Sequence, residues 1–175
     1  QQQSIWDDAM RKEGEAFTKQ FVAKPGCSEH ETGLAIDLAR AAAHIDFIRP
    51  HLPYDGACGR FRALAAKYGF IQRYSREKTE LTGIACEPWH FRYVGAPHAQ
   101  LMEQNGLCLE EYSIFLREMG PQQCRLAGGR VAQVLYVPCE SGQARLPDGC
   151  VQVSGDNAGG FIATVWQAAA WGCGA

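Results

Sequence analysis

The sequence of 175 residues has no marked excess of either charge, no long apolar run and no two cysteines in a C-x-x-C arrangement. Its 17 basic and 19 acidic side chains give no basic field that would hold a phosphate backbone, so we expect no nucleic-acid partner. Apolar runs such as residues 161–165 are far shorter than the roughly 20 residues of a membrane-spanning helix. We therefore expect no transmembrane segment in this form.

The chain also lacks an initial methionine, and no basic segment followed by an apolar one stands at its start. We expect no signal peptide in this form and interpret the start at Gln1 as processed or truncated. Apolar residues make up 46% and charged residues 21%, which is typical of a globular protein. The length fits one domain with an appendage.

Eight cysteines are present, and their spacings are wide and irregular. A chain of this length can form a core without covalent links, so we expect mostly free thiols. A disulfide bond or two among the C-terminal cysteines is the alternative. The cysteines are Cys27, Cys58, Cys86, Cys108, Cys124, Cys139, Cys150 and Cys173.

Hydrophobic periodicity predicts a mixture of helices and strands in the first 120 residues. The expected helices are residues 5–21, 59–68, 98–105 and 109–118. The expected strands are residues 34–38, a strand that starts at 70–71, and residues 81–86 and 90–94. After Gly120 the charges thin out, and three further strand candidates indicate a β-rich extension over residues 121–175: 131–137, 150–153 and 161–165.

Two imidazoles and one carboxylate form a candidate metal set. His30 precedes Asp37 by seven residues, and Asp37 lies within an apolar run, where an unpaired charge would be costly. With His90 they supply three protein ligands and leave a fourth position for water. This is the layout of a catalytic zinc site rather than a structural one, in which all four positions belong to the protein.

Glu87 stands three residues before His90 and is a candidate general base and acid beside the metal. In a straight strand the two side chains would point to opposite faces, so Pro88 should mark a bend or the point where the strand begins. The H-E-x-x-H motif of many metalloproteases is absent. E-x-x-H and H-x6-D each occur by chance as well, so ordinary surface or hydrogen-bonded histidines remain the alternative.

Two segments resemble motifs of the VanY-type D-alanyl-D-alanine carboxypeptidases. Residues 28–37, SEHETGLAID, are similar to the family's S-x-H-x-x-G-x-A-x-D, and residues 87–95, EPWHFRYVG, to its E-P-W-H-x-R-Y-V-G. The motifs follow each other in the family's order, and the likeness covers roughly residues 2–119.

The resemblance implies a small α+β fold with a central antiparallel sheet over residues 1–120. It implies that zinc is held by His30, Asp37 and His90, with Glu87 as base and acid. Ser28 would help to hold the terminal residue of the substrate, and Gln2 would line its pocket. The implied reaction is the release of a terminal D-Ala from peptidoglycan stem peptides or their precursors.

The chain departs from the family in one respect. The family carries Tyr-Arg-Ser upstream of the position of Gln2, and its arginine is expected to stabilise the oxyanion. We therefore expect zinc binding with impaired hydrolysis, since loss of one such donor typically costs about 10²–10³ in turnover.

Other functions remain open. An L,D-carboxypeptidase or a D,D-dipeptidase would use the same metal set, and a non-catalytic module would bind wall peptide without cutting it. We expect an extracytoplasmic or membrane-associated parent protein, with a cytoplasmic one as the alternative. The sequence indicates no oligomeric state. The remaining histidines, His44, His51 and His98, are expected in loops or on the surface.

Overall fold

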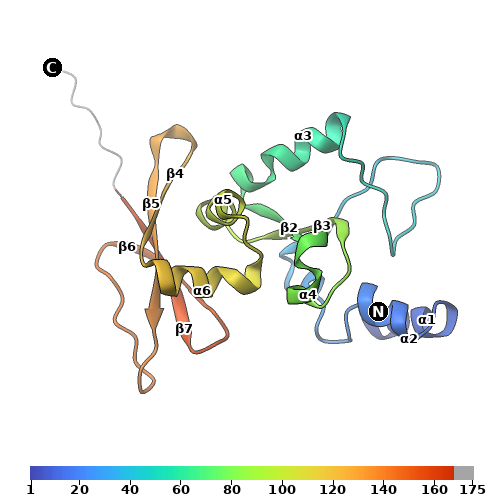
Figure 1. Cartoon of the computed structure of the whole chain (residues 1–175), viewed down its shortest axis with the longest axis horizontal. Helices are drawn as coiled ribbons and strands as arrows, with labels where there is room; N and C mark the ends of the chain where they lie inside the picture. Colours follow the sequence, from blue (N-terminus) through green and yellow to red (C-terminus); the bar gives the residue numbers. More distant parts are fainter. Residues whose placement is uncertain (168–175) are drawn as a thin grey trace. The chain divides into compact units, whose positions relative to one another are not determined.

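The computed structural model describes residues 1–167, so that Cys173 lies outside the described part of the chain. The chain forms two compact units, of which the first ends at Val94 and the second begins at Gly95. Each unit combines helices with a small antiparallel sheet, which confirms the α+β class (Figure 1). Among the described helices, none has both the length and the apolar character needed to cross a membrane.

The first unit has a three-stranded antiparallel sheet in the order β1–β3–β2. Its strands are β1 (Ala35–Asp37), β2 (Phe70–Tyr74) and β3 (Glu87–Tyr93). Its α-helices are α1 (Gln2–Lys12), α2 (Glu15–Phe21), α3 (Gly56–Ala65) and α4 (Thr79–Thr82). Its short 3-10 helices are η1 (Glu29–Thr32), η2 (Ala66–Tyr68) and η3 (Arg76–Lys78).

The structure confirms most of the elements expected in this unit and corrects two. The expected helix over residues 5–21 is wrong as one element, because the chain breaks at Gly14, whose φ of 86° favours glycine. The expected strand over residues 81–86 is also wrong. There α4 ends at Gly83, which has the left-handed backbone that commonly terminates a helix, and β3 begins only at Glu87.

The core of the first unit lies between the sheet and α3. Phe91 of β3 is 1% exposed, and its ring meets that of Phe61 on α3 edge to face at 5.0 Å between centroids. Trp89, Leu52 and Ala65 are buried in the same cluster. Alternation along β3 then turns His90 toward the other face of the sheet, away from this core. In Figure 1, α3 lies on one side of β2 and β3 and α4 on the other.

The second unit has a four-stranded antiparallel sheet in the order β4–β5–β7–β6. Its strands are β4 (Gln122–Arg125), β5 (Val131–Pro138), β6 (Cys150–Gly155) and β7 (Gly160–Trp166). Its helices are α5 (Ala96–Asn105), α6 (Leu109–Met119) and the 3-10 helix η4 (Ala127–Gly129). The helices and the three expected strands are confirmed within a few residues. No strand was predicted from the sequence at the position of β4.

One face of this second sheet packs against α5 and α6, and His98 of α5 is enclosed there. Its Nδ1 shares a hydrogen bond with the Tyr112 hydroxyl at 3.0 Å, and its Nε2 shares one with the Thr164 hydroxyl at 3.1 Å. Tyr112 and Thr164 are buried. The expectation of a loop or surface position for His98 is therefore wrong, because both ring nitrogens have protein partners.

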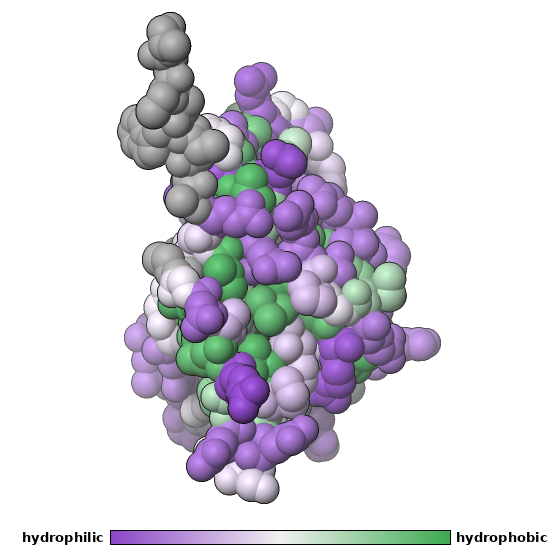
Figure 2. Space-filling view, turned by 90° about the vertical axis from the view of Figure 1, so that its left-hand side faces the viewer, coloured by the Kyte–Doolittle hydropathy of each residue, from purple (hydrophilic) through white to green (hydrophobic). Residues whose placement is uncertain are grey.

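Figure 2 shows hydrophobic residues gathered in the middle of one face, with hydrophilic residues around them. Val153 of β6 and Leu146 of the preceding loop are among the exposed large hydrophobic residues of this unit.

The division into a peptidase domain over residues 1–120 and an extension over 121–175 stays a prediction. The strands of the extension all belong to the second unit, which also includes α5 and α6. The cysteine prediction is confirmed where side chains are described, since these cysteines are free thiols: Cys27, Cys58, Cys86, Cys108, Cys124 and Cys139.

Candidate metal centre and its pocket

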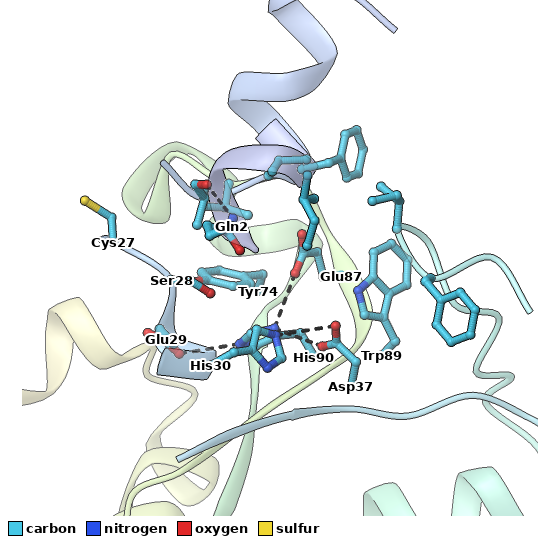
Figure 3. Close-up of a pocket in the computed structure, with 17 residues that line it drawn as sticks. Gln2, Cys27, Ser28, Glu29, His30, Asp37, Tyr74, Glu87, Trp89 and His90 are labelled. Atoms are coloured by element: carbon cyan, nitrogen blue, oxygen red, sulfur yellow. Dashed lines mark hydrogen bonds and ion pairs between the residues drawn. The ribbon is translucent and has the colours of Figure 1, made fainter. Parts of the chain in front are cut away.

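A cavity of about 160 Å³ opens in the first unit and contains every site residue that the sequence suggested (Figure 3). It is lined by 17 residues from the helices, the strands and the loops between them. The six sequence-predicted residues among them are Gln2, Ser28, His30, Asp37, Glu87 and His90. The cavity therefore joins both sequence motifs at one place.

The pairing of β1 with β3 brings two of the candidate ligands together. Asp37 is the direct antiparallel partner of His90. Residues opposite each other in such a pair point to the same face, so the register alone places the carboxylate beside the imidazole. His90 Nδ1 lies 3.1 Å from Asp37 Oδ1.

His30 reaches the same point from η1, the short helix directly before β1. Gly33 ends this helix with a φ of 71°, which turns the chain into the strand. His30 Nε2 lies 3.4 Å from the second oxygen of Asp37, Oδ2. The His30 and His90 rings meet edge to face at 4.8 Å between centroids. Both imidazoles thus flank one carboxylate.

These three side chains fit a divalent metal ion such as zinc. One donor atom from each can be chosen so that all lie within 4.8 Å of one another. His90 Nδ1 lies 3.1 Å from Asp37 Oδ1 and His30 Nε2 lies 3.4 Å from Asp37 Oδ2, so each imidazole is close to one oxygen of the carboxylate. Imidazole nitrogen and carboxylate oxygen are both zinc ligands, and three of them leave one position open.

The pairing of β2 with β3 is irregular near the site, and Glu87 and His90 both line the cavity. Gln72 lies opposite Phe91 and Tyr74 lies opposite Glu87, so the register shifts between these two pairs. Glu87 Oε2 lies 3.7 Å from His90 Nδ1. Pro88 is the second residue of β3, which agrees with the expectation that it marks a bend or the start of the strand.

Burial sets the protonation of Glu87. Its side chain is 8% exposed, and burial raises the pKa of the carboxyl to about 7; the Asp37 carboxylate adds to this rise, whereas His90 opposes it. A carboxyl with a pKa near neutrality can both accept and donate a proton at that pH. This is the property that a general base and acid needs.

The two candidate ligands on the sheet have opposite pKa shifts. Burial lowers the pKa of His90, but its hydrogen bonds with Asp37 and Glu29 outweigh burial and raise the pKa to about 9. Burial raises the pKa of Asp37, but hydrogen bonds with His30 and His90 outweigh it and hold the pKa well below its usual range. The carboxylates of the cavity therefore favour positive charge at the point where the three side chains converge.

Glu29 is a member of the site that sequence reasoning missed. Its Oε2 lies 3.5 Å from His90 Nε2, and its Oε1 accepts a hydrogen bond from Arg73 Nε at 2.9 Å. Burial raises the pKa of Glu29, but His90 and Arg73 outweigh this effect and lower it to about 2. Glu29 stands between Ser28 and His30 in the first motif, yet Arg73 is 44 residues away, so only the folded chain reveals the pairing.

The rest of the cavity has a polar and an apolar part. Ser28 is 9% exposed, and the Gln2 side chain donates a hydrogen bond to the Ala23 carbonyl at 2.6 Å. Tyr74, also not selected from the sequence, has its ring 5.1 Å from that of His90. The apolar part consists of Ile5, Phe21, Phe47, Ile48 and Trp89, among others. His44 and His51 do not line the cavity.

Comparison with known proteins gives a consistent result. The family model VanY, described as D-alanyl-D-alanine carboxypeptidase, matches residues 1–96. The chain is 46% identical over 119 residues to the bifunctional D-Ala-D-Ala dipeptidase and D-Ala-D-Ala carboxypeptidase VanXYC of Enterococcus gallinarum. That match covers 67% of this chain and 63% of the relative, so the chain spans less than two thirds of the relative's length.

Solved structures with similar folds carry related names. The vancomycin-resistance D,D-dipeptidase VanXYg, in complex with a D-Ala-D-Ala phosphinate analogue, superposes with a TM-score of 0.86 at 46% identity, over 95% of this chain and 68% of that one. A mutant of the vancomycin-resistance D,D-pentapeptidase VanY, in complex with Zn(II), gives a TM-score of 0.51 at 36% identity, over 63% of this chain and 64% of that one.

Proposed function

The chain belongs to the VanY family of D-alanyl-D-alanine carboxypeptidases, and from this membership we propose that it is a zinc peptidase that removes the terminal D-Ala from peptidoglycan stem peptides or their precursors. The observation that carries the proposal is the convergence of three metal donors beside one buried carboxyl group. His30, Asp37 and His90 offer donor atoms within 4.8 Å of one another, and Glu87 lies 3.7 Å from His90.

In this proposal His30, Asp37 and His90 hold the zinc ion. When bound, zinc supplies a Lewis acid that polarises the carbonyl of the scissile bond and lowers the pKa of a bound water towards about 7. The β1–β3 register fixes Asp37 opposite His90, and the turn at Gly33 directs His30 to the same point. The fold therefore holds the three side chains in place before substrate arrives.

Glu87 moves the proton of the reaction. Its carboxylate takes a proton from the attacking water as the new carbon–oxygen bond forms. It then delivers that proton to the amide nitrogen as the carbon–nitrogen bond breaks and D-Ala leaves. The pKa of about 7, raised mainly by burial, suits both steps near neutral pH.

The polar part of the cavity binds the terminal residue of the substrate in this proposal. The described residues that line the cavity include no lysine or arginine, so the Ser28 hydroxyl and the Gln2 amide are polar groups that can bind the substrate carboxylate. The apolar part, with Phe21 and Trp89, can receive the methyl groups of D-alanine. A cavity of about 160 Å³ favours small terminal residues.

A D,D-dipeptidase activity is the second candidate. It is supported by the relatives VanXYC and VanXYg, which are 46% identical to this chain and carry dipeptidase in their names. The metal set and Glu87 serve both reactions, because each breaks the amide bond before a C-terminal D-Ala. An extracytoplasmic or membrane-associated parent protein fits the stem-peptide substrate, and a peptidase domain over residues 1–120 fits the family match over residues 1–96.

Three peptides test the proposal and separate the candidates. The zinc-loaded chain is incubated with a stem pentapeptide that ends in D-Ala-D-Ala, a tetrapeptide that ends in one D-Ala, and free D-Ala-D-Ala, and released alanine is measured. The proposal expects alanine from the pentapeptide and its loss after chelation. Release of alanine from free D-Ala-D-Ala as well would support the D,D-dipeptidase activity. Release from the tetrapeptide alone, or from none, contradicts the proposal.

A further inference from the structure

His90 lies between two carboxylates that approach its two ring nitrogens from opposite sides. Nδ1 is 3.1 Å from Asp37 Oδ1, whereas Nε2 is 3.5 Å from Glu29 Oε2. Figure 3 shows Glu29 on one side of the imidazole and Asp37 on the other. Nδ1 is the nitrogen that lies beside both Asp37 and Glu87, so it is the nitrogen on the side of the candidate metal position. Glu29 contacts the other ring nitrogen, Nε2.

Two arginines from neighbouring strands fix the Glu29 carboxylate. Arg73 of β2 donates from Nε to Glu29 Oε1 at 2.9 Å, and Arg92 Nη1 of β3 lies 3.4 Å from Glu29 Oε2. The side chains of Glu29, Arg73 and Arg92 are 17%, 9% and 18% exposed. A charged pair so well shielded from solvent keeps its geometry better than an exposed one, whose side chains are mobile and screened.

We infer that Glu29 is a positioning residue for zinc: its carboxylate accepts the Nε2–H of His90 and so keeps the Nδ1 lone pair directed at the metal. A neutral imidazole carries one N–H, and the partner of that N–H decides which nitrogen is free to bind a metal. Metal-binding histidines commonly donate their second nitrogen to a carboxylate, which fixes both the tautomer and the orientation of the ring. Arg73 and Arg92 hold the carboxylate in the orientation that this hydrogen bond requires. The inference rests on the proposed zinc site and deepens it.

Zinc affinity tests this role without reference to turnover. The dissociation constant is measured by competition with a chelator of known affinity for the wild type, Glu29→Ala, Glu29→Gln and the control Glu31→Gln. Glu31 belongs to the same short helix, but it is exposed, and its carboxylate accepts a hydrogen bond from the Gly26 backbone N–H at 3.3 Å. We expect Glu29→Ala to weaken zinc binding about 10- to 100-fold and the control to leave it unchanged. Glu29→Gln keeps an acceptor oxygen and is expected to lose less.

A second readout separates positioning from a structural role. Long-range ¹⁵N–¹H NMR correlations report which nitrogen of His90 carries the proton in the zinc-loaded protein. We expect Nε2–H in the wild type and in Glu31→Gln, and a loss of that single form in Glu29→Ala. If the alanine variant does not fold, as judged by circular dichroism, Glu29→Gln carries the test, because its neutral amide oxygen accepts a weaker hydrogen bond from His90 Nε2–H than the carboxylate does.

The possible outcomes distinguish this inference from the proposed function. A wild-type chain that binds no zinc overturns both. A wild type that binds zinc while folded Glu29 variants match the control in affinity and in the His90 tautomer overturns the role of Glu29 alone and leaves the proposed function standing.

Discussion

Asp37 and His90 are direct partners across the antiparallel pair β1–β3, with His90 Nδ1 3.1 Å from Asp37 Oδ1. This pairing joins two residues that are 53 positions apart in the sequence, one from each motif, at one point of the sheet. A shift of the register by one residue would turn one of the two side chains to the opposite face. The geometry of the site thus depends on strand pairing as much as on the residues themselves.

Glu87→Gln is expected to keep zinc and to lose turnover. The amide has nearly the shape of the carboxyl but cannot take up and release the proton, so kcat should fall by about 10²- to 10⁴-fold. Zinc content should stay at the wild-type level, since Glu87 is not among the three proposed ligands. Kinetics on the pentapeptide, with metal analysis of the same sample, check both parts. Undiminished hydrolysis would remove Glu87 from the mechanism.

Ser28→Ala is expected to weaken substrate binding more than catalysis. The buried hydroxyl lines the cavity, and a hydrogen bond from it to a substrate carboxylate is worth about 1.5–3 kcal/mol. We therefore expect KM to rise about 10- to 100-fold with a much smaller change in kcat. The exposed Ser4 of α1 supplies the control variant, Ser4→Ala. A change in kcat with KM constant would argue against a role in holding the substrate.

His98 is expected to make the second unit less stable at acidic pH. Burial lowers its pKa in the folded chain to about 4, against about 6.5 in the unfolded chain. Between these values only the unfolded chain takes up the proton, so stability is lost as pH falls through this window. At pH 5 this proton uptake lowers the free energy of unfolding by about 2 kcal/mol.

Urea unfolding at pH 7 and pH 5 measures this effect. The His98→Gln variant should lose less stability than the wild type between the two pH values, although it is less stable at pH 7 because its contacts with Tyr112 and Thr164 change. His44→Gln, at an exposed position in the first unit, controls for the removal of a histidine. Equal pH dependence in the wild type and His98→Gln would contradict a pKa lowered by burial.

The sequence predicted the chemistry of the site better than its surroundings. The spacing of His30, Asp37, Glu87 and His90 left ordinary histidines as an alternative, and the resemblance of two motifs to the VanY-type family selected these four residues. All four line the cavity. Their roles remain proposals. The position of Pro88 at the start of β3 could also be expected, because residues three apart in a straight strand point to opposite faces.

The pairing of Glu29 with Arg73 could not be derived from the sequence. No regular spacing connects residues 44 positions apart, and only the folded chain brings Glu29 of η1 within hydrogen-bond distance of Arg73 of β2. The break between α1 and α2 was missed for a related reason. The apolar spacing continues through Gly14, so periodicity alone hides the backbone change at that residue.

Zinc stoichiometry tests the central claim most directly. The wild type, the double variant His30→Ala/His90→Ala, and Glu87→Gln are loaded with zinc, freed of excess metal by gel filtration and analysed by mass spectrometry of the metal. We expect about one zinc per chain in the wild type and in Glu87→Gln, and almost none in the double variant. A double variant that retains one zinc per chain would contradict the account.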